Sequence, residues 1–214
     1  MTPTISNYGD HALLIRWPTD GFSEPVNDAV HHLAAHLRES GRYIEVVPGY
    51  DSIVCVFDLG LRSMSSAKRH VEDGLARHIS KTTTAGKLVE IPVNYGGTYG
   101  PDMPTICATA KLTEDAVIAL HSGQIYRVCM MGFIPGFSFL SPAPIALHHP
   151  RHATPRAKVP AGSLGIANWQ TGIYGLESPG GWQIIGRTSF SIFDPEREAP
   201  FLLNAGDRVR FIPQ

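Results

Sequence analysis

Glycine and proline punctuate residues 132–188 so densely that no helix of ordinary length fits there. Both residues recur in segments 132–137, 159–163 and 178–182, and a further Pro-Arg pair lies at 155–156. Proline lacks the amide hydrogen that a helix interior needs, and glycine loses the most backbone entropy on ordering, so both favour turns. The span therefore predicts short strands joined by ordered loops. Arg, Gln, Ser and Trp side chains on such loops are typical of a recognition surface.

The first 88 residues have a different pattern. One helical stripe follows Ser23 and ends near Gly41: Val26, Val30, Leu33 and Leu37. A second stripe has fourfold spacing: Ala67, Val71, Leu75 and Ile79. Strand-like runs cover residues 12–17, 43–47, 52–57 and 87–93, and a Pro-Gly turn joins the middle two as a hairpin. The order β-α-β-β-α-β predicts a ferredoxin-like α+β unit.

After the polar segment 81–86 the composition shifts toward Gly and Pro. Thr113 precedes one more helix, which Gly123 follows. Residues 125–131 form an apolar run expected to be buried on both faces, and shorter runs at 164–167, 183–185, 190–193 and 209–212 alternate with turns. These runs predict a closed or nearly closed β-barrel. We therefore expect an α+β domain over residues 1–86 and a mainly-β barrel domain over residues 87–214.

The composition excludes several classes of protein. The chain has 214 residues, 43% of them hydrophobic and 17% charged, and a net charge of −1, which is ordinary for a soluble globular protein. Without a Lys/Arg block it lacks the footprint of a nucleic-acid binder, and no apolar run is long enough to span a membrane. The N-terminus does not resemble a signal peptide. We expect a cytoplasmic protein whose Cys55, Cys107 and Cys129 are thiols, the first and last buried.

Self-contained catalytic motifs are missing from the sequence. There is no phosphate loop, no Gly-x-Ser-x-Gly elbow, no zinc-helix motif and no Cys-x-x-Cys. His148, His149 and His152 are closely spaced, but Pro150 interrupts them and no fourth ligand is adjacent, so solvated loop histidines are expected and no metal site. The chain alone is therefore not expected to complete a reaction, although it can supply half of a composite site.

Two arginines are the strongest ligand candidates. Arg156 and Arg187 sit beside Gly/Pro turns, and a guanidinium matches a carboxylate or phosphate in a bidentate geometry. The alternative is that one or both tie loops together through backbone carbonyls. His121 falls in the last turn of its helix, where an imidazolium is favoured and could serve acid–base chemistry. A helix cap or a packed histidine is the alternative for His121.

Other side chains in the loops have two possible uses. Gln170, Thr171 and Tyr174 could orient a small amide or carboxylate. The aromatic residues near the arginines are typical of an interface with a partner, although some would be core in a monomer. The interface candidates are Phe133, Phe137, Trp169 and Trp182.

Several of these strings together resemble the allophanate hydrolase subunit 1 family, which includes the B subunit of bacterial 5-oxoprolinase and the sporulation kinase inhibitor KipI. The resemblance rests on segments 132–137, 154–156, 159–163, 170–174 and 178–188, with 95–97, 99–102 and 120–122 upstream. It covers residues 90–212 strongly and residues 1–88 weakly. Segment 141–152 departs from the usual Gly-rich pattern, which puts in doubt any specificity inferred from relatives there.

The resemblance implies a cyclophilin-like barrel and a protein that is inactive without its partners. The implied complex is a heteromeric, ATP-dependent 5-oxoprolinase that opens 5-oxoproline to glutamate. One partner would be an allophanate hydrolase subunit 2-like protein, similar to the C subunit of 5-oxoprolinase, and another would resemble the A subunit. ATP with Mg would bind a surface shared with the partner. Without a Met-Lys attachment pair, the chain itself would not carry biotin.

Within that resemblance the candidate residues take roles. His121, Arg156 and Arg187 would be catalytic. Substrate or nucleotide would contact a further set: Gly136, Ser163, Gln170, Thr171, Tyr174, Gly180 and Gly181. Two alternative functions follow from other members of the family. One is a carboxyltransferase-type subunit of a urea carboxylase or allophanate hydrolase-like system, and the other is a KipI-like inhibitor of a sensor histidine kinase.

Overall fold

A computed structural model describes residues 2–78 and 86–214 of the chain. The chain divides into two compact units, Met1–Thr84 and Ala85–Gln214, and each has its own hydrophobic core. The predicted boundary segment 81–86 lies outside the described residues except for Gly86, and so does Ile79 of the second predicted helix. Among the described residues, no helix has the length and apolar character needed to cross a membrane.

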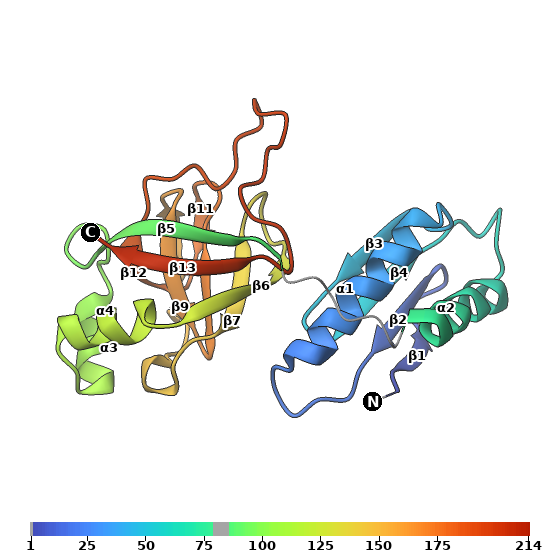
Figure 1. Ribbon diagram of the computed structural model, residues 1–214, viewed down its shortest axis with the longest axis horizontal. Helices are drawn as coiled ribbons and strands as arrows, with labels where there is room; N and C mark the ends of the chain where they lie inside the picture. Colours follow the sequence, from blue (N-terminus) through green and yellow to red (C-terminus); the bar gives the residue numbers. More distant parts are fainter. Residues whose placement is uncertain (1, 79–85) are drawn as a thin grey trace. The chain divides into compact units, whose positions relative to one another are not determined.

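The first unit is a four-stranded antiparallel sheet with two helices (Figure 1). Its elements are β1 (Thr4–Asn7), β2 (Ala12–Arg16), α1 (Glu24–Glu39), β3 (Glu45–Pro48), β4 (Ser52–Val56) and α2 (Met64–His78). The strand order is β1-β2-β4-β3. The predicted stripe of α1 is buried, and the core it joins includes Leu13, Ile53 and Val71. The predicted hairpin is β3 paired with β4.

One edge of this sheet differs from the prediction. The strand expected after the second helix, residues 87–93, lies in the other unit as part of β5 (Leu88–Tyr95). The place beside β2 is taken instead by β1, which precedes α1 in the chain. The residues of β1 are mostly exposed, so they lack the alternating apolar pattern by which a strand is recognised. The α+β class is confirmed, with a different edge strand.

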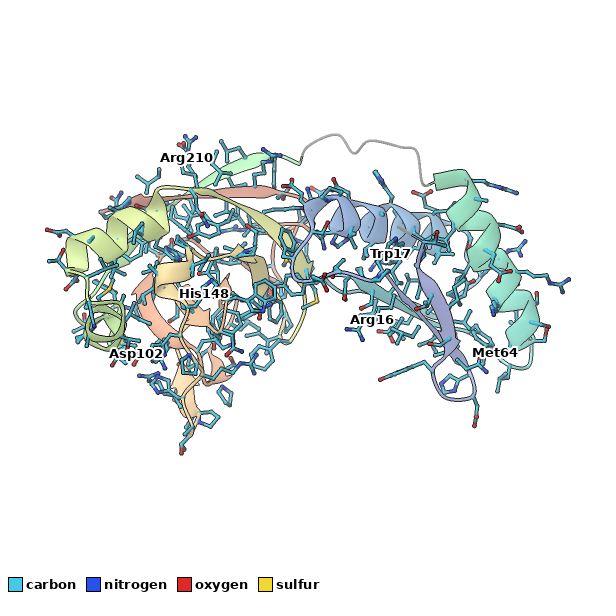
Figure 2. All side chains as sticks on the ribbon, turned by 90° about the horizontal axis from the view of Figure 1, so that it is seen from below. Arg16, Trp17, Met64, Asp102, His148 and Arg210 are labelled. Atoms are coloured by element: carbon cyan, nitrogen blue, oxygen red, sulfur yellow. The ribbon has the colours of Figure 1, made fainter. Side chains whose placement is uncertain are left out.

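The second unit is a closed seven-stranded barrel with the order β10-β7-β6-β13-β5-β12-β9. Its strands are β5, β6 (Ile125–Met131), β7 (Ser138–Pro142), β9 (Ser163–Ala167), β10 (Gln170–Ile173), β12 (Gln183–Arg187) and β13 (Arg208–Pro213). β5 and β13 run side by side and parallel, whereas the other neighbours are antiparallel (Figure 1). Arg210 of β13 lies on the outside of this unit (Figure 2), where it pairs with Glu90 at 3.0 Å.

Smaller elements complete the barrel unit. β8 (Arg156–Val159) and β11 (Ser178–Gly180) form a separate two-stranded sheet. Helices α3 (Met103–Ala110) and α4 (Glu114–Ser122) follow β5, and a 3₁₀ turn, η1, covers Ile145–Leu147. The predicted cap of α4 is confirmed, because the Thr113 hydroxyl accepts a hydrogen bond from the Ala116 amide at 3.3 Å.

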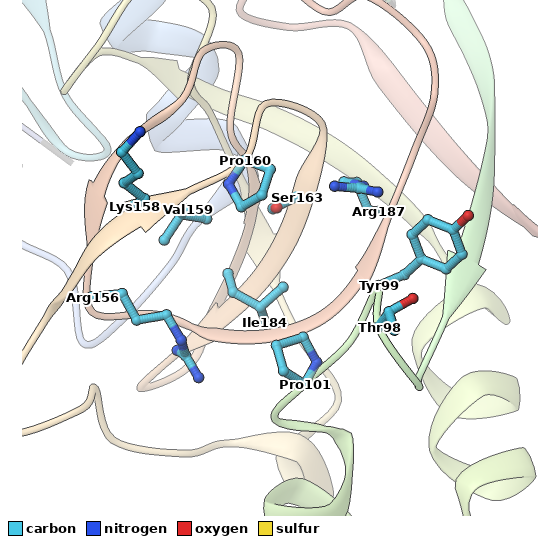
Figure 3. A pocket seen from close by; sticks show the side chains of 10 residues that line it. All are labelled: Thr98, Tyr99, Pro101, Arg156, Lys158, Val159, Pro160, Ser163, Ile184 and Arg187. Atoms are coloured by element: carbon cyan, nitrogen blue, oxygen red, sulfur yellow. The ribbon is translucent and has the colours of Figure 1, made fainter.

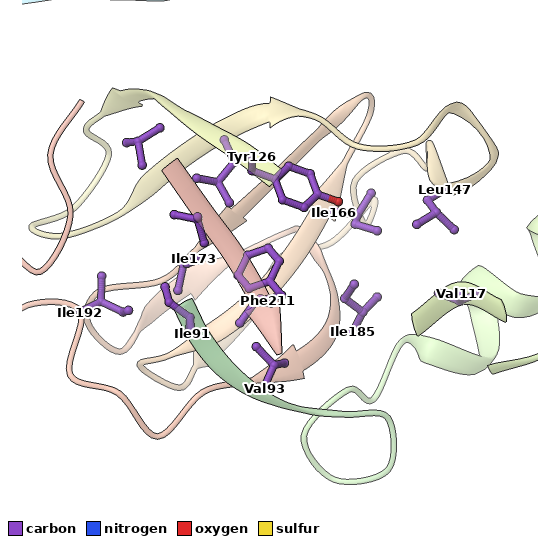
Figure 4. Close-up of a cluster of buried hydrophobic side chains, with 14 of the residues drawn as sticks. Ile91, Val93, Val117, Tyr126, Leu147, Ile166, Ile173, Ile185, Ile192 and Phe211 are labelled. Atoms are coloured by element: carbon purple, nitrogen blue, oxygen red, sulfur yellow. The ribbon is translucent and has the colours of Figure 1, made fainter. Parts of the chain in front are cut away.

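The interior of the barrel is filled by aliphatic and aromatic side chains from all around the wall (Figure 4). They include Ile91, Val93, Tyr126, Leu164, Ile166, Ile173 and Phe211. The predicted strands at 125–131, 164–167, 183–185 and 209–212 are confirmed. Residues 190–193 are not a strand and contribute an isolated bridge from Phe193 to Phe201. Just before them, the Thr188 hydroxyl accepts a hydrogen bond from the Phe190 amide, a local contact that competes with regular strand pairing.

Cysteine burial agrees with the sequence prediction. Cys55 lies in the core of the first unit and Cys129 in the barrel unit, both buried. Burial raises the pKa of the Cys55 thiol to about 12, which keeps it protonated and unreactive at neutral pH.

Candidate functional site

A β-bulge at the end of β12 aims Arg187 out of the barrel. Ile184 pairs with Gly165 of β9 and Gly186 pairs with Leu164, so Ile185 is an extra residue in the ladder. Gly186 faces the interior, since a Cβ atom there would lie 2.9 Å from Cγ1 of Val93. Side chains alternate along a strand, so the next residue, Arg187, faces outward. Without the bulge, the alternation from the buried Ile185 would turn Arg187 into the apolar core.

The strands on both sides place polar residues beside Arg187. In the ladder Arg187 is opposite Asn94 of β5 and Ser163 of β9. Its guanidinium carbon lies 4.9 Å from the centre of the Tyr99 ring, a cation–π contact. Among the residues that the structure describes, no carboxylate forms an ion pair with it. Arg187 is therefore held in place by an aromatic face, with its hydrogen-bond donors available.

A pocket of about 170 Å³ opens beside this arginine (Figure 3). Its lining comes from the turn after β5, from β8, and from the ends of β9 and β12: Thr98, Tyr99, Pro101, Arg156, Lys158, Val159, Pro160, Ser163, Ile184 and Arg187. Three of these residues are cationic and none is acidic. Both predicted arginines and Ser163 thus lie at one site. The lining is suited to an anionic group.

Arg156 differs from Arg187 because it has a carboxylate partner. Its Nη2 donates to Oδ1 of Asp102 at 2.6 Å, and its Nη1 donates to Nε2 of His152 at 2.8 Å. Asp102 is buried and also binds the backbone of Ile184, accepting from its amide through Oδ2 at 2.6 Å and donating its own amide to the Ile184 carbonyl at 2.9 Å. We call these contacts among Asp102, Arg156, His152 and the Ile184 backbone the Asp102 clasp. They hold β12 in place just before the bulge. Arg156 does tie loops together, but through a carboxylate and an imidazole and not through backbone carbonyls.

Lys158 also has a partner in the described part of the chain. Its Nζ lies 3.1 Å from Oε1 of Glu177, and both side chains are largely exposed, so this pair is weak. Arg156 is bound to Asp102 and Lys158 is paired only weakly with Glu177, so Arg187 is the cation of the lining that has no carboxylate partner among the described residues. A single guanidinium over a small pocket has the geometry to bind one carboxylate or phosphate group.

His121 is not the accessible acid–base group that the sequence predicts. It does lie in the last turn of α4, but it is fully buried inside the barrel, and its ring stacks on Phe211 at 5.0 Å. Burial lowers the pKa of His121 to about 3, so the ring is neutral at physiological pH. The expectation of an imidazolium is wrong, because desolvation outweighs the helix C-terminus.

The contacts of His121 identify its tautomer. The Thr171 hydroxyl donates to the Gly165 carbonyl at 3.0 Å, so its oxygen accepts from Nε2–H of His121 at 2.9 Å. Nδ1 then accepts from the Tyr95 hydroxyl at 2.8 Å. Thr171, which we expected to contact a ligand, is instead one member of this satisfied network inside the barrel. The packed-histidine alternative describes His121.

The glycines expected to let a ligand approach instead accommodate the protein's own side chains. A Cβ atom on Gly136, whose φ is +75°, would lie 2.5 Å from Cβ of Phe193. On Gly180 it would overlap the Tyr174 hydroxyl, and Tyr174 itself is buried. A Cβ atom on Gly181 would lie 3.7 Å from its nearest neighbours, so that position has room for a side chain. Gln170 is half-buried at the start of β10, and none of these residues is among those lining the pocket.

Two of the four aromatic interface candidates are core residues. Phe137 and Trp182 pack against each other with ring centres 5.3 Å apart, and both are at least 95% buried. They belong to a small cluster between the barrel and the β8–β11 sheet, so their assignment to a partner surface is wrong. Phe133 is 65% exposed with a positive φ of 67°, and Trp169 is half-buried. Phe133 is the candidate whose exposure fits an interface.

The three loop histidines are not simply solvated. His148 contacts the Ala143 carbonyl through Nε2 at 3.0 Å, and the backbone of His149 pairs with that of Asn168. His152 accepts from Arg156 in the Asp102 clasp. His149 and His152 therefore hold segment 141–152 against its neighbours, whereas His148 makes a contact within the segment. In the described ranges, no group of three His, Cys, Asp or Glu side chains is arranged to hold a metal ion.

Sequence reasoning missed two residues of the site, Asp102 and Tyr99. Both lie in the segment 99–102, which carried part of the family resemblance but received no role. An Asp followed closely by Pro104 is also a helix-start signal, and α3 begins directly after it. That signal could have located α3, but not the partner of Asp102, which lies 54 residues further along the chain.

The fold and pocket define a class of protein: an α+β unit joined to a closed barrel, with one half-buried arginine at a small pocket that is lined by cationic residues. A family model, the carboxyltransferase domain, subdomains C and D, matches residues 3–203. The chain belongs to this family. Its predicted membership of the allophanate hydrolase subunit 1 group is confirmed by relatives that are named as the B subunit of 5-oxoprolinase.

Two such relatives match most of the chain. The protein from Bacillus subtilis is 39% identical over 220 residues, which cover 97% of this chain and 91% of the relative. The protein from Escherichia coli O157:H7 is 43% identical over 189 residues, 86% of this chain and 84% of the relative.

Solved structures agree on the fold. TTHA0988 is 36% identical with a TM-score of 0.83, and the match covers 95% of this chain but 39% of TTHA0988. PH0987 from Pyrococcus horikoshii is 40% identical with a TM-score of 0.59, and the match covers 99% of this chain and 97% of that one. Urea amidolyase from K. lactis has a TM-score of 0.80 at 18% identity, covering 99% of this chain and 15% of that one, and so shows the fold alone.

Proposed function

We propose that this chain is the B-type subunit of a multi-subunit 5-oxoprolinase, a hydrolase system that opens 5-oxoproline to glutamate. The relatives named as the B subunit of that enzyme support this at 39–43% identity over 83–91% of their own lengths. The site supports it because 5-oxoproline is a small cyclic amide with one carboxylate, and Arg187 is one uncompensated guanidinium over a small pocket.

Arg187 is the observation that carries the proposal. The carboxylate of 5-oxoproline would accept from the Arg187 guanidinium, whose orientation is set by the Tyr99 ring and by the bulge. The volume of about 170 Å³ is below the range of roughly 300–1,000 Å³ typical for drug-sized ligands, which suits a compact substrate. Ser163 is paired with Arg187 in the ladder and lines the same pocket, where its hydroxyl would contact the ligand.

Catalysis would be completed by a partner protein. The pocket contains cations and hydroxyls but, among the described residues that line it, no carboxylate or imidazole to move a proton. We therefore expect no activity from this chain alone. The partners would be an allophanate hydrolase subunit 2-like protein, of the C type, and a further protein of the A type. The match to TTHA0988 supports a physical link to further protein, since the similar part is 39% of that longer chain.

ATP with Mg belongs to the proposal as the energy source, with its site shared with the partner. The small pocket does not fit a whole nucleotide, but its cations fit a phosphate group. We also expect the complex in the cytoplasm, where ATP is supplied and thiols such as Cys55 and Cys107 stay reduced.

The test is reconstitution. The chain would be co-expressed with its A-type and C-type partners, and glutamate release from 5-oxoproline would be followed with and without ATP. Turnover that needs ATP and the complete set of proteins is the expected result. Turnover by this chain alone, or none by the complete set, would overturn the proposal. The carboxyltransferase alternative rests on the description of the matched family and on a fold likeness at 18% identity, whereas the relatives of 39–43% identity are named as 5-oxoprolinase subunits. No feature of the pocket favours the kinase inhibitor.

A further inference from the structure

Arg187 and Tyr99 form the shared wall of two pockets, and the second is the larger. It has a volume of about 520 Å³ and is lined by Asn94, Tyr99, Ala161, Gly162, Gly175, Leu176, Arg187, Thr188, Ser189, Phe190, Ser191, Ile192 and Phe193. Much of this wall is the segment after β12, where the sequence predicts a strand and the structure has a loop. This volume falls within the range of pockets that bind drug-sized organic ligands. Such ligands are larger than any that the small pocket can take.

The lining combines aromatic side chains with a cation. Phe190 is 44% exposed and Phe193 is half-buried, and the partly exposed Leu176 also lines the pocket. Exposed aromatic rings in a pocket are platforms on which a flat ring can stack. Ser189 and Ser191 of the same loop also line the pocket.

Part of the lining is suited to an anion. Arg187 is the charged residue of this lining, and Thr188 is its neighbour in the chain. The Thr188 hydroxyl accepts from the Phe190 amide at 3.1 Å, so its own hydrogen remains to be donated. A guanidinium and a hydroxyl donor side by side match the oxygens of a phosphate.

We propose that this larger pocket binds a nucleotide, with the base against Phe190 and Phe193 and the phosphates directed to Arg187 and Thr188. The inference rests on the proposed function, in which the smaller pocket holds the substrate carboxylate on the other side of Arg187. One arginine then contacts both ligands, which brings the phosphates and the substrate to the same point. The partner protein and Mg would supply the remaining phosphate contacts.

Binding to the full-length chain tests this without catalysis. Calorimetric titrations would use ATP, adenosine, inorganic phosphate and 5-oxoproline. Loss of a stacked aromatic costs roughly 5- to 150-fold in affinity, so Phe190→Ala should weaken ATP and adenosine by that factor and leave 5-oxoproline within about twofold. Lys158→Gln, in the smaller pocket, should weaken 5-oxoproline and leave adenosine unchanged. Arg187→Gln should weaken ATP and 5-oxoproline, but not adenosine.

Tyr8→Ala is the matched control, since Tyr8 is an exposed aromatic in the first unit. It should change none of these affinities, and circular dichroism should show all variants folded. The inference is overturned if no nucleotide binds more tightly than about 1 mM, or if Phe190→Ala weakens 5-oxoproline and spares ATP. Phosphate that binds as tightly as ATP would also overturn it. Nucleotide binding that depends on Phe190, without 5-oxoproline hydrolysis by the reconstituted complex, would uphold the pocket and reject the proposed function.

Discussion

At the scale of single residues, the role of an arginine in this barrel depends on the carboxylates within its reach. Arg156 and Arg187 line the same pocket, but Asp102 neutralises only Arg156. The sequence pointed to both arginines equally, because the chemistry of a guanidinium and its Gly/Pro surroundings can be read locally. It could not separate them, because Asp102 lies on a distant turn and the bulge that aims Arg187 depends on strand register.

Arg187→Gln should reduce activity of the reconstituted complex more than it affects folding. A lost charge-assisted contact costs about 1.5–3 kcal/mol, so kcat/KM for 5-oxoproline should fall roughly 10- to 150-fold. Thermal melting should hardly change, because the arginine has no ion-pair partner among the described residues. Arg187→Lys should keep part of the activity through its charge. Rates within about twofold of wild type for Arg187→Gln would assign this arginine to structure.

Asp102→Asn should have the opposite effect, acting first on stability. It removes the charge that binds Arg156 and leaves a partly buried guanidinium unpaired, at a cost of about 1.5–3 kcal/mol. Glu177→Gln is the matched control, since its pair with Lys158 is largely exposed and should contribute less than about 1 kcal/mol. Urea unfolding of both variants gives the comparison. Equal losses of unfolding free energy would show that burial does not make the Asp102–Arg156 pair stronger than the Glu177–Lys158 pair.

At the scale of elements, the sequence predicted the segments that have a strong internal period and missed the short ones. Helix α1 and strand β6 were predicted because a long stripe or a continuous apolar run must be buried. Strands β8 and β11 have four and three residues, and their pairing depends on a partner elsewhere in the chain. The segment 190–193 has apolar residues without a ladder, and a local hydrogen bond from the Phe190 amide to the Thr188 hydroxyl precedes it. An apolar pattern reports neither the pairing partner of a short strand nor such a local side-chain contact.

The network between α4 and the barrel should make stability depend on pH. The pKa of His121 is lowered from 6.5 to about 3, so the folded state excludes a proton that the unfolded chain takes up. The resulting stability is present above about pH 6.5 and declines as pH falls toward 3, by up to about 1.4 kcal/mol per pH unit. His121→Gln should be less stable at neutral pH and should lose less stability between about pH 6 and 4. The free energy of unfolding of wild type and of His121→Gln would be measured in urea at each pH. Curves that run parallel would contradict this role for His121.

At the scale of the whole molecule, the separation of core from surface decides which aromatic residues can contact a partner. Phe137→Ala or Trp182→Ala should destabilise the barrel unit by about 3–5 kcal/mol, the usual cost for a large core aromatic. Phe133→Ala should change stability by less than about 0.5 kcal/mol, because this side chain is mostly exposed. It should nevertheless weaken association with the C-type partner by at least about 2 kcal/mol. If the folded Phe133→Ala variant still bound the C-type partner with wild-type affinity in a pull-down, the interface would lie elsewhere.

The division into two units predicts that the barrel unit carries ligand binding by itself. Both pockets are lined by residues of this unit, and among the described residues its cores contain none from the first unit. A fragment covering residues 86–214 begins just before β5, whose pairing with β13 closes the barrel, and should therefore fold. It should bind 5-oxoproline within about twofold of the full chain and lose that affinity on Arg187→Gln, measured by calorimetry. A folded fragment whose affinity is more than about tenfold weaker would mean that the first unit contributes to the site.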